Sequence, residues 1–167
     1  MKVLLFGNIA TGKTTIANTI VNDNPFLEYL SIDDFRRKYS NGTIITEITA
    51  VERFTSSIKK TKPQLIEATG FGEVGNNIYS KLKETSENIL LVILTQDLKT
   101  IYKRLGKRIT DVPYPDEFDA LTLTVENINK KILTGDLFTR WGNLENVSVF
   151  KSNDTDLIIR VINEFIN

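Results

Sequence analysis

Five short apolar runs, each bounded by turn-forming residues, recur along the chain. They cover Val3–Phe6, Leu27–Ile32, Gln64–Ala68, Ile89–Leu94 and Val147–Phe150. The runs are continuously apolar rather than alternating, which is typical of strands that are buried on both faces of a parallel sheet. The pattern therefore predicts a five-stranded, mostly parallel sheet.

Helical periodicity fills the gaps between these runs. The first stripe follows the first strand and comprises Ile16, Ile20 and Val21; a second has three-four spacing and comprises Ile44, Ile48, Val51, Phe54 and Ile58. A third helix is expected from Pro115 to Lys131 with Gly135 as its C-terminal cap, and a last one after Asn153 or Asp154. Strands that alternate with helices predict an α/β fold, as one three-layer α/β/α domain over residues 1–167.

Composition narrows the chemistry more than it narrows the fold. Lys plus Arg equals Asp plus Glu at 21 each, so no global charge bias indicates a nucleic-acid or membrane partner. The longest apolar run, Ile89–Leu94, is too short to cross a bilayer, and we expect a cytoplasmic protein. The chain has no cysteine and no histidine. A general base would therefore be a carboxylate, a lysine or a tyrosine.

The first strand leads into MKVLLFGNIATGKTT, which contains the spacing Gly7-x-x-x-x-Gly12-Lys13-Thr14. This spacing is the P-loop motif, in which loop N–H groups and a helix N-terminus surround phosphate oxygens. We expect Lys13 to reach the β- and γ-phosphates of ATP and the Thr14 hydroxyl to ligate Mg²⁺. The residues expected to bind the cofactor are Gly7, Asn8, Ala10, Thr11, Gly12, Lys13, Thr14 and Thr15.

The stretch SIDDFRRKY follows the second predicted strand and places Asp33 at its carboxyl end. Open α/β sheets bind ligands at that edge, so Asp33 could accept the proton of an attacking hydroxyl while Arg36 holds an anionic acceptor. Alternatively, Asp33 only caps the next helix, and the basic residues after it form a solvated face. Both interpretations stay open on the sequence alone.

A second basic stretch, KRLGKR, places Arg104 and Arg108 four residues apart, on one side of a helix. Two guanidinium groups there could stabilise the charge on a phosphoryl group in transfer. The loop-like TDVPYPDE follows, and we expect a mobile lid over about residues 104–115. The alternative is a basic last turn that the helix dipole favours.

The third strand ends in LIEATGFGE, where Glu67 could bind Mg²⁺ through water, or could simply end the strand before a glycine-rich connection. The fourth strand ends in LTQD, where a GTPase would need Asn-Lys-x-Asp to read guanine. Motors normally add a strongly acidic Walker-B strand and extra domains, and we expect neither here. Transfer of a phosphoryl group is therefore favoured over a timing or motor role.

At these residues the sequence resembles the small P-loop kinases, and among them the phage-type 5′-polynucleotide kinase domain. DNPFLEYLSIDDFRRKY and KRLGKRITDVP carry this resemblance, while IEATG and ILTGDLFTRWGN look like the zeta-toxin kinases. The resemblance implies that Asp33 is the general base and that Arg36 holds an acceptor phosphate. It also implies that Arg104 and Arg108 act in the transition state.

We therefore expect an ATP- and Mg²⁺-dependent kinase whose acceptor is a polynucleotide 5′-hydroxyl, a nucleoside or a nucleotide. The alternatives are a nucleotide-sugar kinase of the zeta-toxin type and an ATP-sensing regulator. A helical region over about residues 34–61 should cover the acceptor, with Glu47, Glu52 and Arg53 as specificity contacts unless they form a solvated face. The pair Arg140–Trp141 could stack on an adenine, although a lone tryptophan more often covers a core edge.

Overall fold

The computed structural model describes residues 1–107 and 118–167. Within them lies a five-stranded sheet in the order β2-β3-β1-β4-β5, and every neighbouring pair is parallel. The strands are β1 (Lys2–Gly7), β2 (Glu28–Ser31), β3 (Gln64–Ala68), β4 (Ile89–Leu94) and β5 (Val147–Ser152). The predicted parallel sheet is confirmed.

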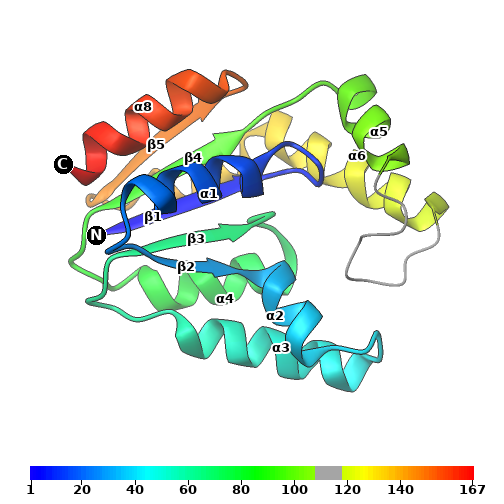
Figure 1. The fold of residues 1–167 in the computed structure, drawn as a ribbon, viewed down its shortest axis with the longest axis horizontal. Coiled ribbons are helices and arrows are strands. Elements are labelled where there is room, and N and C mark those ends of the chain that lie inside the picture. The colour runs from blue at the N-terminus through cyan, green and yellow to red at the C-terminus, as the bar shows by residue number, and fades with distance from the viewer. Residues whose placement is uncertain (108–117) are drawn as a thin grey trace.

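Helices cover both faces of the sheet and form the expected three layers (Figure 1). One face carries α1 (Lys13–Asp23) and α8 (Thr155–Ile166). The other face carries α3 (Ile44–Ser57), α4 (Gly72–Leu82), α6 (Phe118–Thr134) and α7 (Asp136–Trp141). The shorter helices α2 (Ile32–Tyr39) and α5 (Leu98–Gly106) lie beyond the carboxyl ends of the strands (Figure 1).

The central strand β1 explains why the core has two halves. Its side chains alternate between the faces, so that Val3 and Leu5 pack with α1 and α8 while Leu4 and Phe6 pack with α4 and α7. All four are fully buried. A strand with an apolar residue at every position can only be placed between two helical layers, which is the physical basis of the continuous pattern in the sequence.

Trp141 belongs to this core. Its side chain has no exposed surface, and its ring packs edge-on against Tyr79 and Phe6 at centroid distances of 5.1 Å and 6.2 Å. The neighbouring Arg140 donates to Asn76 Oδ1 at 2.7 Å and lies over the Tyr79 ring. The adenine-stacking alternative is therefore wrong for Trp141, and the core interpretation is confirmed.

Helix ends differ from the sequence-based expectation in two places. Helix α3 ends at Ser57, one residue before the last position of the predicted apolar stripe, Ile58, and the Gln64 side chain binds the backbone at Ser57 and Lys59 just beyond it. Gly135, expected only as a cap, has φ +82° and joins α6 directly to the six-residue α7, which is too short to show a periodicity. Residues 115–117 of the expected third helix lie outside the described residues.

The chain offers no candidate for a membrane-spanning helix in the part that the structure describes, since none of its helices there is both long and apolar enough.

Candidate active site

The predicted P-loop joins β1 to α1 in the expected strand–loop–helix order. Gly7 lies so close to β4 that an added Cβ would be 2.7 Å from the Leu94 carbonyl oxygen. Gly12, at the start of α1, has φ +101°, a conformation that residues with a side chain rarely adopt. The two glycines of the motif are therefore required by a close approach and by a positive φ, respectively.

The Lys13 ammonium lies inside the loop. Its Nζ donates to the carbonyl oxygens of Asn8 at 2.7 Å and of Gly7 at 3.2 Å, and the side chain is largely buried. This places a cation beside the N-terminus of α1, where the helix dipole and free N–H groups also favour an anion. Phosphate oxygens are the ligands that such an arrangement suits.

Asn8 links the P-loop to α6 and to the next residue of the loop. Its side-chain amide donates to the Val125 carbonyl in α6 at 2.8 Å, and its Oδ1 accepts from the Ile9 N–H at 2.8 Å. Neither Gly7 nor Asn8 lines the cavity described below, whereas Ala10, Thr11, Gly12, Lys13, Thr14 and Thr15 do. Among the residues expected to bind the cofactor, these two shape the loop and the other six face the cavity.

Arg104 contacts the outer side of the loop from α5. Its Nη1 donates to the Ala10 carbonyl at 3.0 Å, and Ala10 has a positive φ of +57°. The bond holds the loop in this strained turn. Arg108 and the expected lid from residue 108 to 115 lie outside the described residues, so the arginine pair stays a prediction.

Glu67, the last but one residue of β3, connects the P-loop helix to β2. Its Oε1 accepts from the Thr14 hydroxyl at 2.8 Å, and its Oε2 accepts from the Tyr29 hydroxyl. Burial, together with the Glu67 carboxylate, raises the pKa of Tyr29 above that of a free tyrosine. The sequence analysis missed Tyr29. The β2–β3 register places it on the same sheet face as Glu67, so knowledge of the strand pairing would have found it.

The Thr14 hydroxyl and the Glu67 carboxylate fit a Mg²⁺ site in the nature of their donor atoms. Magnesium prefers oxygen ligands, and it often keeps several waters and binds substrate phosphates instead of being held by protein alone. Residues 1–107 and 121–167 contain no group of three or more acidic side chains that could hold a metal ion by themselves. These two residues would therefore share the ion with phosphate oxygens and water.

Asp33 lies in the first turn of α2 but does not cap it. The N-cap position belongs to Ser31, and no side chain makes the capping hydrogen bond. The capping interpretation of Asp33 is therefore wrong. The carboxylate instead accepts from Arg36 Nη1 at 3.3 Å, and Arg36 reaches across to Glu47 on α3, with Nη2–Oε1 at 2.7 Å and Nε–Oε1 at 2.8 Å.

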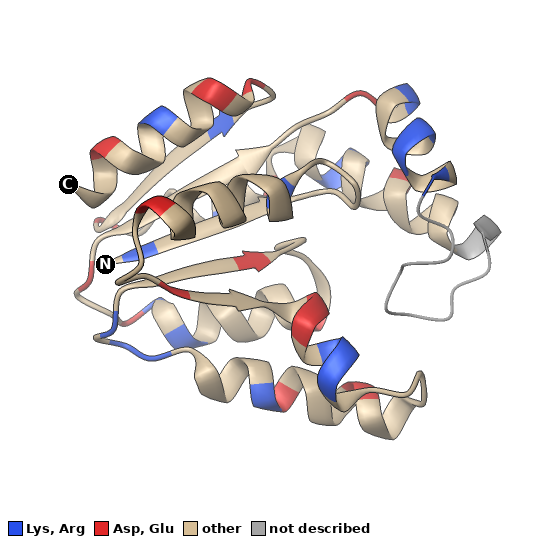
Figure 2. Cartoon of the chain, in the orientation of Figure 1, with Lys and Arg blue, Asp and Glu red and all other residues tan. Residues whose placement is uncertain are grey.

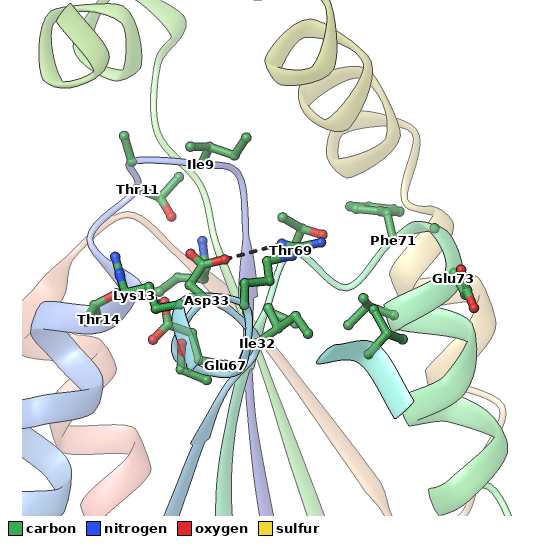
Figure 3. A pocket seen from close by; sticks show the side chains of 18 of the residues that line it. Ile9, Thr11, Lys13, Thr14, Ile32, Asp33, Glu67, Thr69, Phe71 and Glu73 are labelled. Carbon is green, nitrogen blue, oxygen red and sulfur yellow. Dashed lines mark hydrogen bonds and ion pairs between the residues drawn. The ribbon is translucent and has the colours of Figure 1, made fainter. Parts of the chain in front are cut away.

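A single cavity of about 410 Å³ brings these groups together at the carboxyl edge of the sheet (Figure 3). Its lining includes the P-loop and β3 residues Lys13, Thr14 and Glu67 together with the α2 and α3 residues Asp33, Arg36 and Glu47. Of the three expected specificity contacts only Glu47 lines this cavity; Glu52 and Arg53 are exposed on α3, and the Arg53 guanidinium lies over the Tyr39 ring at 5.9 Å.

A second, more open hollow of about 780 Å³ adjoins the first between α3, the β3–α4 connection and α6. The two share Arg36, Glu47 and Phe71 in their walls, so the part of the cavity near Asp33 opens into a wider groove. The dimensions of both fall within the range of small-molecule sites.

Comparisons with known proteins show which solved structures share this fold. No family model matches the chain, and no curated protein sequence matches it. Among solved structures, a shikimate kinase from Bacteroides thetaiotaomicron is 12% identical with a TM-score of 0.61, covering 99% of this chain and 98% of that one. A gluconokinase from Sinorhizobium meliloti 1021 is 11% identical with a TM-score of 0.60, covering 95% and 87%.

A deoxyadenosine kinase from M. mycoides is 16% identical with a TM-score of 0.58, covering 100% of this chain and 99% of that one. At such low identity these likenesses establish the fold alone, an α/β/α fold that these kinases share over nearly the whole length of this chain. The more specific resemblance to phage-type polynucleotide kinases and to zeta toxins stays a prediction.

Proposed function

We propose that this chain is an ATP- and Mg²⁺-dependent kinase that transfers the γ-phosphoryl group of ATP to a hydroxyl. One observation carries the proposal: a phosphate-binding loop and a carboxylate that does not cap its own helix line the same cavity, at the sheet edge where open α/β sheets bind ligands.

Some residues of the cavity would bind ATP and the metal, and others would act on the acceptor hydroxyl. The loop N–H groups and Lys13 would hold the β- and γ-phosphates, and Thr14 with Glu67 would hold the metal, which neutralises charge on the phosphates when it is bound. The acceptor oxygen attacks the γ-phosphorus while the bond to the β–γ bridging oxygen breaks, so ADP leaves. Asp33 accepts the hydroxyl proton. Arg104 supports the loop through Ala10, and we assign Arg108 to the charge of the transferring group.

The class of acceptor is inferred from the space beside the phosphate loop. We propose a nucleotide-containing or nucleoside acceptor, with a polynucleotide 5′-hydroxyl or a nucleoside as the candidates. A cavity of about 410 Å³ that opens into a wider groove offers room for such a molecule beside the phosphate loop. The shared fold with a deoxyadenosine kinase supports this choice.

The experiment uses γ-labelled ATP with a panel of 5′-hydroxyl oligonucleotides, nucleosides, nucleotide sugars and tRNA ends. Asp33→Asn should bind ATP as the wild type does and transfer phosphate at least a hundredfold more slowly, within the range for a general base. The matched control is Asp34→Asn, since Asp34 pairs with Arg37 at 3.0 Å and does not line the cavity. Its transfer rate should stay close to that of the wild type.

Near-full turnover in Asp33→Asn would show that the base assignment is wrong. Tight ATP binding without transfer to any acceptor would instead favour an ATP sensor. Label that appears only on nucleotide sugars would favour the zeta-toxin-like alternative.

A further inference from the structure

Arg36, which lines the cavity beside Asp33, already forms ion pairs with two carboxylates. Arg36 binds Asp33 on its own helix and Glu47 on α3, and only 21% of its side chain is exposed. Asp33 and Glu47 are 37% and 38% exposed, so solvent reaches both carboxylates. With one cation and two anions, this Asp33–Arg36–Glu47 triad carries a formal charge of −1.

The neighbouring charges do not reverse this balance. Arg37 lines the cavity but pairs with Asp34 at 3.0 Å. Glu73, in the first turn of α4, adds a further negative charge to the lining (Figure 3). In the adjoining groove, the Lys131 ammonium lies over the Phe71 ring at 5.7 Å. Figure 2 shows the same mixture of both signs along α2 and α3.

A phosphate or carboxylate on the acceptor would meet two carboxylates at this arginine. If the anion displaced Glu47 from Arg36, Glu47 would lose its partner while it stays partly buried. If Glu47 remained in place, the anion would lie against like charge. Either route disfavours an anionic acceptor, in contrast to the sequence-based expectation that Arg36 holds an acceptor phosphate.

We propose that Glu47 is a specificity-determining residue that keeps Arg36 on Asp33, so that the acceptor is uncharged in the part that adjoins Arg36. Among the acceptors proposed above, this favours a nucleoside over a nucleic-acid end that carries a 3′-phosphate. The inference about the acceptor rests on the proposed kinase function. The inference about the Arg36–Glu47 pair rests on geometry alone and can be tested separately.

The first experiment measures the affinity for inorganic phosphate by isothermal titration calorimetry. Each protein is compared with the same protein carrying Arg36→Gln. Phosphate that binds at the P-loop contributes equally to both affinities, so their ratio reports only the phosphate that Arg36 binds. In the wild-type background, Arg36→Gln should change the phosphate affinity less than twofold. In the Glu47→Gln background, the same substitution should weaken phosphate binding at least tenfold, since Arg36 no longer pairs with Glu47 and its Nε and Nη2 can donate to the anion.

Glu52→Gln is the matched control, because Glu52 lies on the same helix but outside the cavity. It should behave as the wild type does in this comparison. The proposal is overturned if Arg36→Gln weakens phosphate binding twofold or more in the wild-type background, or if the effect in the Glu47→Gln background stays below tenfold. Should Glu47→Gln fail to fold, the wild-type comparison alone decides, since it asks directly whether Arg36 binds the anion.

The second experiment compares thymidine with thymidine 3′-monophosphate as acceptors, both of which offer a 5′-hydroxyl. The wild type should favour thymidine by at least tenfold in kcat/KM, and Glu47→Gln should reduce or reverse that preference. A wild-type preference for the monophosphate contradicts the proposal. If neither compound is phosphorylated, the proposed acceptor class is wrong, while the phosphate titration still decides the role of Glu47.

Discussion

Replacing Tyr29 with phenylalanine tests how the buried carboxylate of Glu67 is held. The Glu67 side chain is only 3% exposed, and both of its oxygens accept hydroxyl hydrogen bonds, from Thr14 and from Tyr29. The substitution removes one hydroxyl and leaves the ring. It therefore deletes a single hydrogen bond to a buried charge and changes little else in the packing.

The magnitude follows from this burial. A hydrogen bond to a charged group contributes about 1.5–3 kcal/mol, and at a site this enclosed water restores little of it. In a domain of this size, 1 kcal/mol shifts the Tm by roughly 2–4 °C, so Tyr29→Phe should lower the Tm by about 3–12 °C. Because Glu67 is the proposed metal-side carboxylate, the Mg²⁺ concentration that half-saturates turnover should rise as well.

The assay is thermal unfolding followed by circular dichroism, with Tyr102→Phe as the control. Tyr102 also donates its hydroxyl to a glutamate, Glu126, at 3.0 Å, but this bond is exposed to solvent. Water can replace it, so the control should lose much less stability. The reasoning is refuted if the two variants lose the same stability, or if Tyr29→Phe loses less than about 0.5 kcal/mol, the usual scatter for surface substitutions.

Two further predictions concern close packing and pH. Gly75→Ala should destabilise the protein by about 1–3 kcal/mol or more in chemical denaturation, because the added Cβ would clash with the Gly70 carbonyl oxygen. The control is Gly106→Ala, whose added Cβ has no atom within 4 Å and which should not lose this stability. Equal losses of stability in the two variants would contradict the packing argument. Since burial raises the pKa of Tyr29, this hydroxyl should stay protonated in the folded protein above about pH 10, where a free tyrosine ionises. Its contribution to stability is therefore complete below that pH and declines as the pH rises further. In an ultraviolet titration near pH 10.5, folded wild type and folded Tyr29→Phe should show the same number of tyrosinates. One tyrosinate fewer in Tyr29→Phe would contradict this prediction, because it would mean that Tyr29 is ionised in the wild type.

The geometry of the loop between β1 and α1 was predictable because the loop is built from consecutive residues. The positive φ of Gly12 and the close approach at Gly7 are local requirements, and a buried strand followed by a helix is visible in the pattern of apolar positions. The same reasoning located Thr14 and Glu67, since carboxyl ends of parallel strands share one edge of the sheet. Local rules and strand edges were sufficient here.

The acceptor end could not be predicted in the same way because its contacts join separate elements. The partner of Arg36 is Glu47, which lies on α3 beyond the turn, so the pair depends on how α2 and α3 pack. Tyr29, on the metal side of the site, could not be predicted for the same reason: its bond to Glu67 joins residues 38 positions apart and depends on the pairing of β2 with β3. No periodicity or spacing in the sequence contains that information.

In the proposed reaction, the guanidinium of Arg36 could either orient the base Asp33 or bind an anion on the acceptor. A base carboxylate must point at the hydroxyl before transfer begins, and an arginine that holds it there is not available to an acceptor phosphate. We propose that Glu47 keeps Arg36 on Asp33, because it pairs with Arg36 from a second helix. On this proposal, acceptor selectivity depends on the packing of α3 on α2 as well as on the Asp-x-x-Arg motif, so changing Glu47 alone should alter it.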